Sequence, residues 1–279
     1  MTMRSLLLVV LLGTVQAAVP AGTRIDPANV AFGYTDQTGT RLLVLALEDN
    51  VSLDATKARQ LVAAVCAEGQ VLPIQYLSMQ VGSAGGNGRQ GARNFAHESG
   101  PLFEITTGHA AASDTCMLVP ADYIAAFPIV PNELPMTERG TPANASRQAV
   151  IEKAKGRSVK FYWPLFRSAP AQQVAAVEFA PEGDSLLGAV VLVESAHLSF
   201  MDMPASIKKG EKDGGCWRVD DECHFGADGM KVQAVLGSPG RQLIFITLDG
   251  AEGKLILLLL AQDGVLVKLK NAYRYQAPI

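Results

Sequence analysis

The second half of the chain consists of short apolar segments separated by turn signals. Pro239-Gly240, Asp249-Gly250 and Asp263-Gly264 stand between the later segments. Short strands with regular turn signals are typical of an antiparallel meander, so we expect a barrel or a sandwich in this half. The expected strands span residues 159–166, 174–179, 186–193, 197–203, 231–236, 243–248, 254–261 and 266–275.

The faces of these strands differ in polarity. The last strand carries Lys268 and Lys270 on the face opposite to its apolar residues, as expected where one face meets solvent. The segment LILLLLA has no polar face, which predicts that this strand is covered on both sides. Large aliphatic side chains should fill the interior, so we expect no large pocket in this half. They are Ile244, Ile246, Leu257 and Leu259.

The first half has a different pattern. Residues 41–47 form an apolar run of strand length, and residues 71–81 form another. Between them, residues 55–68 place apolar side chains on one helical face, which predicts a helix that ends at Gly69. This strand–helix–strand unit indicates an α/β module. Further strands are expected at 102–106 and 116–119, with a short helix at 121–127.

The two halves meet in a segment with prolines at positions 128, 131, 135 and 142. Proline stiffens a chain without donating to a sheet, so this segment is the best linker candidate. A helix over residues 146–155 should follow it. The fold class is therefore α+β: a signal peptide at 1–17, an α/β module at 18–135, a linker and helix at 136–157, and an antiparallel β module at 158–279.

The N-terminus has the three-part pattern of a secretory signal peptide. Arg4 precedes an apolar run at residues 6–12, and the small residues Val15 and Ala17 mark a cleavage site after Ala17. The alternative is a buried N-terminal strand. The apolar run is too short to span a membrane, and we expect no transmembrane segment after signal removal. We therefore expect an exported protein, periplasmic or extracellular.

Charge argues against a polyanionic partner. The formal net charge is -3, and the only basic clusters are Lys208-Lys209 and the pair Lys153 and Lys155. Nucleic acid is therefore excluded as a partner. Charged residues make up 18% of the chain and apolar residues 48%, which fits a well-buried globular core.

The chain has four cysteines, an even number that suits disulfides in an exported protein. Pairing within each half gives Cys66–Cys116 and Cys216–Cys223, the second pair stapling a hairpin. The alternative for the second pair is a metal site formed with His224. A structural zinc site usually has a second pair of ligands, which is missing here, so we expect no metal.

The segment GNGRQG at residues 86–91 matches the glycine fingerprint of dinucleotide-binding folds. That fingerprint requires a following helix, but the chain reaches Gly100-Pro101 within ten residues. We therefore interpret residues 82–91 as a glycine-rich loop and expect no cofactor.

The candidate catalytic residues lie in this loop and in the segment that follows it. Ser83 or Ser99 could act as a nucleophile with His97 or His109 as base and Asp114 as the acid, because triads are defined by geometry rather than chain order. This hypothesis predicts that Ser83 and His97 converge to hydrogen-bond distance. The leading hypothesis is a non-catalytic envelope or secreted protein with a binding or accessory role, whose partner is another protein or a small apolar ligand. The rival is an exported serine-type hydrolase with its site in residues 82–100.

Overall fold

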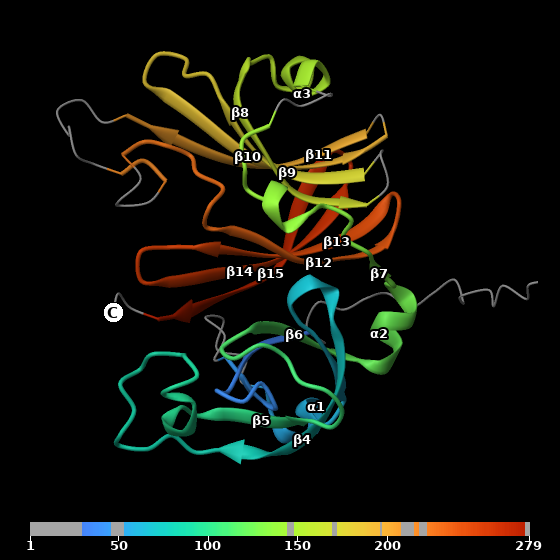
Figure 1. Cartoon of the computed structure of the whole chain (residues 1–279), viewed down its shortest axis with the longest axis vertical. Helices are drawn as coiled ribbons and strands as arrows, with labels where there is room; N and C mark the ends of the chain where they lie inside the picture. Colours follow the sequence, from blue (N-terminus) through green and yellow to red (C-terminus); the bar gives the residue numbers. More distant parts are fainter. Residues whose placement is uncertain are drawn as a thin grey trace, which may run out of the picture.

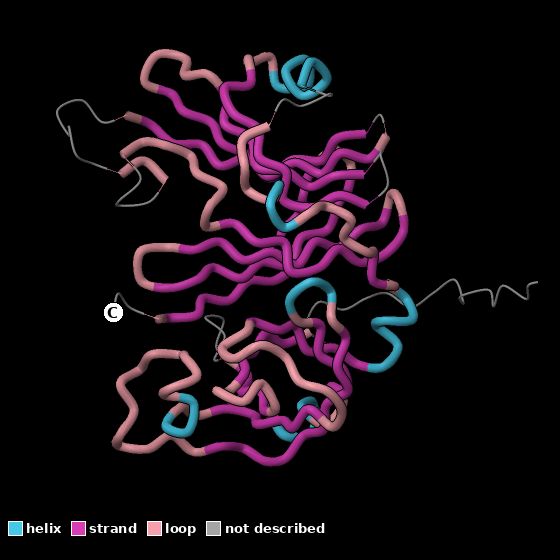
Figure 2. Tube along the Cα trace, viewed as in Figure 1, coloured by secondary structure: helices cyan, strands magenta, loops and turns pink. Residues whose placement is uncertain are grey.

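Antiparallel β-strands dominate the computed structural model of the chain (Figures 1 and 2). The structure describes residues 30–45, 53–143, 148–168, 172–195, 197–207, 215–217 and 222–276. The expected signal peptide at 1–17 lies outside these residues. No helix in the described part of the chain is long and apolar enough to cross a membrane.

The first half is a closed antiparallel barrel in the strand order β1-β2-β5-β4-β3-β6. Its interior is filled by aliphatic side chains with Phe103 and the cysteines Cys66 and Cys116. Closure pairs the backbone groups that an open sheet would leave exposed at its edges. The strands are β1 (Ala31–Thr35), β2 (Arg41–Val44), β3 (Leu61–Val65), β4 (Val71–Gln80), β5 (Gly100–Ile105) and β6 (Thr115–Pro120).

The helix expected over residues 55–68 is wrong, and with it the α/β module. Only α1 (Ala55–Ala58) is helical there, capped by the Asp54 carboxylate on the Lys57 N–H at 2.8 Å. Strand β3 follows at once and pairs with both β4 and β6. The apolar spacing of these residues is compatible with a helix or a strand. The strand is favoured because it forms backbone hydrogen bonds with a neighbour on each side and closes the barrel. Gly69, the expected end of the helix, instead ends the short 3-10 turn η2 (Ala67–Gly69).

The second half contains two four-stranded antiparallel meanders in one nine-stranded sheet. The meanders join where β11 and β15 meet in parallel at Phe200 and Val265. The first meander is β8 (Val159–Ser168), β9 (Gln172–Phe179), β10 (Ser185–Glu194) and β11 (His197–Ser206). The second is β12 (Met230–Ser238), β13 (Arg241–Asp249), β14 (Gly253–Gln262) and β15 (Val265–Tyr275), with the short β7 (Ile129–Val130) on its edge.

The meanders face each other as a sandwich, and the second meander also packs on the barrel (Figure 1). Strand β14 lies in the middle of this stack. Its Leu257 and Leu259 face the first meander, while Ile256 and Leu258 face the barrel through Phe32 and its neighbours. The prediction that this strand is covered on both sides is confirmed. Ile244 and Ile246 help to fill the space between the meanders, as expected.

The connection between the halves is packed rather than extended. After α2 (Ala121–Ala126) and β7, the chain follows the edge of β8: Glu133 donates its N–H to the Arg167 carbonyl at 2.7 Å and Gly140 to the Pro164 carbonyl at 2.9 Å. The turn η4 (Met136–Glu138) lies in this stretch. Helix α3 (Gln148–Lys155) then contributes Ile151 to the apolar cluster on the outer face of the first meander.

Candidate functional site

The glycine-rich loop between β4 and β5 brings Ser83 and His97 together. The Ser83 Oγ lies 2.6 Å from the His97 Nδ1, and the Ser83 N–H also donates to the His97 carbonyl at 3.0 Å. The turn η3 (Phe95–His97) places the imidazole against Gly85, where a Cβ would lie 2.8 Å from the ring. The convergence predicted for this pair is therefore present in the structure.

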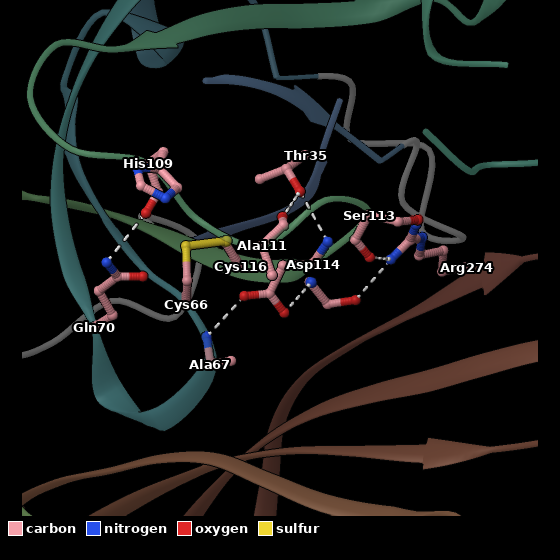
Figure 3. Close-up of a disulfide and its surroundings, with 11 residues drawn as sticks. Thr35, Cys66, Ala67, Gln70, His109, Ala111, Ser113, Asp114, Cys116 and Arg274 are labelled. Atoms are coloured by element: carbon pink, nitrogen blue, oxygen red, sulfur yellow. Dashed lines mark hydrogen bonds between the residues drawn. A yellow bond between two sulfur atoms is a disulfide. The ribbon is translucent and has the colours of Figure 1, made fainter. Parts of the chain in front are cut away.

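The other residues of the hypothetical triad are not assembled around this pair. The Asp114 carboxylate accepts from the N–H groups of Ala67 at 3.1 Å and Thr115 at 2.9 Å, beside the barrel disulfide (Figure 3). His109 accepts a hydrogen bond from Gln70 through its backbone carbonyl. Ser99 is exposed, and no side-chain hydrogen bond joins it to another described residue.

The Ser83–His97 contact also uses the wrong nitrogen for a Ser-His-Asp arrangement. In that arrangement Nε2 takes the serine proton, while the Nδ1–H is held by a carboxylate. Here Nδ1 faces the serine, and the nearby Glu98 carboxylate accepts from Asn94 instead. Among the described residues, no carboxylate bonds to the imidazole. The pair therefore joins the two sides of the loop as a Ser–His dyad.

Both disulfides are formed, in the pairs that the sequence favours. Cys66–Cys116 joins residues 50 apart inside the barrel, and Cys216–Cys223 joins residues 7 apart next to the sandwich. Asp114 lies close to the sulfur atoms of the first pair, the one cluster of metal-ligating residue types among the described residues. Because both sulfur atoms are in a disulfide, they offer no thiolate to a metal.

The second disulfide lies beside a pocket of about 390 Å³ between the meanders, which we call the inter-sheet pocket. Its apolar wall consists of Met203, Trp217, Phe225, Met230, Leu248, Leu255 and Tyr273. The expectation that this half contains no large pocket is therefore wrong. The aliphatic core fills the middle of the sandwich, but the pocket opens at its end, where a loop rather than a strand covers the sheet.

Two aromatic residues next to the second disulfide shape the wall. Trp217 follows Cys216, and its Nε1–H donates to the Met203 carbonyl at 2.7 Å. The Phe225 ring meets the Trp217 ring edge to face, with centroids 5.2 Å apart. The disulfide and this hydrogen bond together hold the indole in place, so the wall is formed before any ligand arrives.

The ionisable side chains that line the pocket are His224, Asp228, Asp249 and Tyr273. Asp228 is exposed, and no cation pairs with it among the described residues. Asp249 pairs with Lys254 at 2.6 Å. Burial, with a smaller contribution from Glu252, raises the pKa of the Tyr273 hydroxyl.

A buried arginine holds the barrel, the glycine-rich loop and β15 together. The Arg274 guanidinium is fully buried and donates to the Gln90 carbonyl at 2.7 Å and the Thr115 hydroxyl at 3.0 Å. It also donates to the Ser113 carbonyl at 2.8 Å (Figure 3). It also lies over the Tyr34 ring, 4.6 Å from the centroid. Burial lowers the pKa of Arg274 to about 10. This group is structural, since all of its contacts are internal to the fold.

Sequence reasoning missed the pocket and Arg274. A signal for the pocket was present: Trp217 follows the first cysteine of a short disulfide loop and Phe225 lies two residues after the second, so the disulfide positions both rings. No local signal marks Arg274, because it ends an alternating strand like any exposed residue.

Comparison with known proteins adds no relative. No family model matches the chain, and neither a curated protein nor a solved structure is significantly similar to it.

Proposed function

We propose that the protein is an exported, non-catalytic binding protein whose inter-sheet pocket takes up a small ligand with an apolar body. One observation carries the proposal: a pocket of about 390 Å³ whose wall is built from aromatic and thioether side chains. Pockets of this size, mainly apolar with a few polar groups at their edge, are typical of small-molecule sites.

The rigidity of the wall supports this proposal. Trp217 is held by its hydrogen bond to the Met203 carbonyl and by the neighbouring disulfide, and Phe225 packs on it. A wall that is already ordered loses little side-chain freedom on binding, so more of the contact energy remains as affinity. The thioethers of Met203 and Met230 adapt to ligands of different shape.

Export is supported by two independent features. The first residues have the pattern of a signal peptide, and the two disulfides are compatible with an oxidising compartment.

The experiment is a titration of the mature protein with the neutral fluorophore N-phenyl-1-naphthylamine. We expect saturable binding that weakens about tenfold or more in Trp217→Ala, because a central aromatic anchor is removed. Met203→Ala should weaken binding severalfold. Its matched control, Met79→Ala, changes an exposed methionine of the barrel and should leave binding unchanged. Absence of saturable binding, or equal effects of the two methionine variants, would contradict the proposal.

A serine-type hydrolase at the glycine-rich loop is the second candidate, favoured by the 2.6 Å contact between Ser83 and His97. A fluorophosphonate probe tests it, because that reagent labels activated serines. Labelling that is lost in Ser83→Ala and kept in Ser99→Ala would support a hydrolase. An unlabelled protein leaves the Ser83–His97 pair as a contact that closes the loop.

A further inference from the structure

The walls of the inter-sheet pocket favour a positively charged group. Trp217, Phe225 and Tyr273 contribute three aromatic rings, and the indole N–H of Trp217 is already used by the Met203 carbonyl. The face of an aromatic ring carries negative charge density and attracts a cation, most strongly for tryptophan.

The charged groups of the pocket also favour a cationic ligand. Asp228 and Asp249 both line it together with His224, and no lysine or arginine does among the residues that the structure describes there. Lys254 pairs with Asp249, which leaves Asp228 as the pocket carboxylate without a cationic partner among the described residues. An anionic ligand would meet like charge at the opening, whereas a cation would meet the Asp228 carboxylate.

We infer that the ligand of the inter-sheet pocket is an organic ammonium ion: a cationic nitrogen on an aromatic or aliphatic body. This inference rests on the proposed binding function and specifies its ligand class. The body packs against Met203, Met230 and Leu255, and the nitrogen lies among the rings with Asp228 at the opening.

Three probes with the same ring system separate charge from apolar contact. They are (2-naphthylmethyl)trimethylammonium, 2-naphthaleneethanol and 2-naphthaleneacetate, titrated against the mature protein by calorimetry. We expect the ammonium probe to bind about tenfold more tightly than the neutral alcohol, and the acetate to bind most weakly.

Substitutions then test whether Asp228 is responsible for the preference for a cation. Asp228→Asn should weaken binding of the ammonium probe severalfold and leave the alcohol unchanged. The matched control is Asp202→Asn, which makes the same charge change on β11, one residue from Met203 but in an ion pair with Lys155. This control should change neither affinity.

Each outcome has one meaning. If the alcohol binds as tightly as the ammonium probe, or if Asp228→Asn leaves the ammonium probe unaffected, the inference is wrong while the binding function stands. If none of the three probes binds, and N-phenyl-1-naphthylamine does not bind either, the proposed function itself is wrong.

Discussion

The two disulfides of this protein lie in opposite surroundings. Cys66 and Cys116 are fully buried inside the barrel and join two segments 50 residues apart. Cys216 and Cys223 are half-buried, lie 7 residues apart and are close in sequence to Trp217 and Phe225, which line the inter-sheet pocket. A bond that closes a long loop acts mainly on folding, whereas a bond that closes a short loop beside two rings acts mainly on the shape of the pocket.

The barrel disulfide should have the largest effect on stability. The double variant Cys66→Ala/Cys116→Ala should lose about 4 kcal/mol of unfolding free energy, because the loop that it closes is long. Removing the second disulfide in the same way should cost about 2.5 kcal/mol at most. Urea unfolding of the two double variants measures the difference.

For ligand affinity, removal of the second disulfide should have the larger effect, the reverse of the order for stability. Cys216→Ala/Cys223→Ala should weaken binding of N-phenyl-1-naphthylamine severalfold, since the segments that carry Trp217 and Phe225 are then no longer joined covalently. The folded barrel variant should bind normally. Equal losses of affinity would break the contrast between the two regions.

Arg274 connects the regions, and its removal should cost nearly as much as the barrel disulfide. Arg274→Met leaves the half-buried carbonyls of Gln90 and Ser113 without their donor, so we expect a loss of about 2–4 kcal/mol. The control Lys268→Met changes an exposed residue of the same strand and should stay within about 0.5 kcal/mol. Chemical denaturation checks both, and a small effect at Arg274 would show that the barrel and sheet are held by apolar packing alone.

Gly188 on β10 tests the packing behind the pocket. A Cβ at this position would lie 2.5 Å from the Phe225 ring, so Gly188→Ala must displace that ring. We expect a loss of about 1–3 kcal/mol, together with a change in Trp217 fluorescence. Gly91→Ala is the matched control, because its added methyl group meets no atom within 4 Å. If Gly188→Ala changes neither the unfolding free energy nor the fluorescence, Phe225 is free to move.

Tyr123 should have the smallest effect at neutral pH and a visible one in alkali. It lies between the barrel and the sheet, and burial raises the pKa of its hydroxyl. The unfolded chain loses this proton near pH 10 and the folded chain only above it, so stability is full below about pH 10 and falls as the pH rises further. Tyr123→Phe should remove part of that fall in stability, measured as urea midpoints between pH 8 and 11.

At pH 7 the unfolding free energy of Tyr123→Phe should stay within about 0.5 kcal/mol of the unsubstituted protein, because no described group bonds to the hydroxyl. Exposed Tyr275→Phe serves as the control, and an identical alkaline profile in Tyr123→Phe would refute the assignment.

Each region could be predicted from sequence to a different extent. All the strands expected in the second half overlap observed ones, because alternation and turn residues such as Asp263-Gly264 are local signals. In the first half the helix over 55–68 was wrong, because spacing alone does not distinguish a helix from the strand β3 that closes the barrel. At the candidate sites, the pairing of Ser83 with His97 followed from a loop that brings the two residues close, whereas the pocket did not follow from any strand pattern.

The sequence by itself determined the positions of most strands, the pairing of the cysteines and the burial of both faces of β14. These features depend on the periodicity and spacing of nearby residues. Only the tertiary structure decided that the first half closes as a barrel, that the meanders leave a pocket at one end, and that Arg274 is buried. The hydrogen-bond acceptors of Arg274 stand 161 and 184 residues earlier in the chain, so no local pattern contains them. Burial of a charge is favourable only where distant segments supply its partners, and the fold alone brings those segments together.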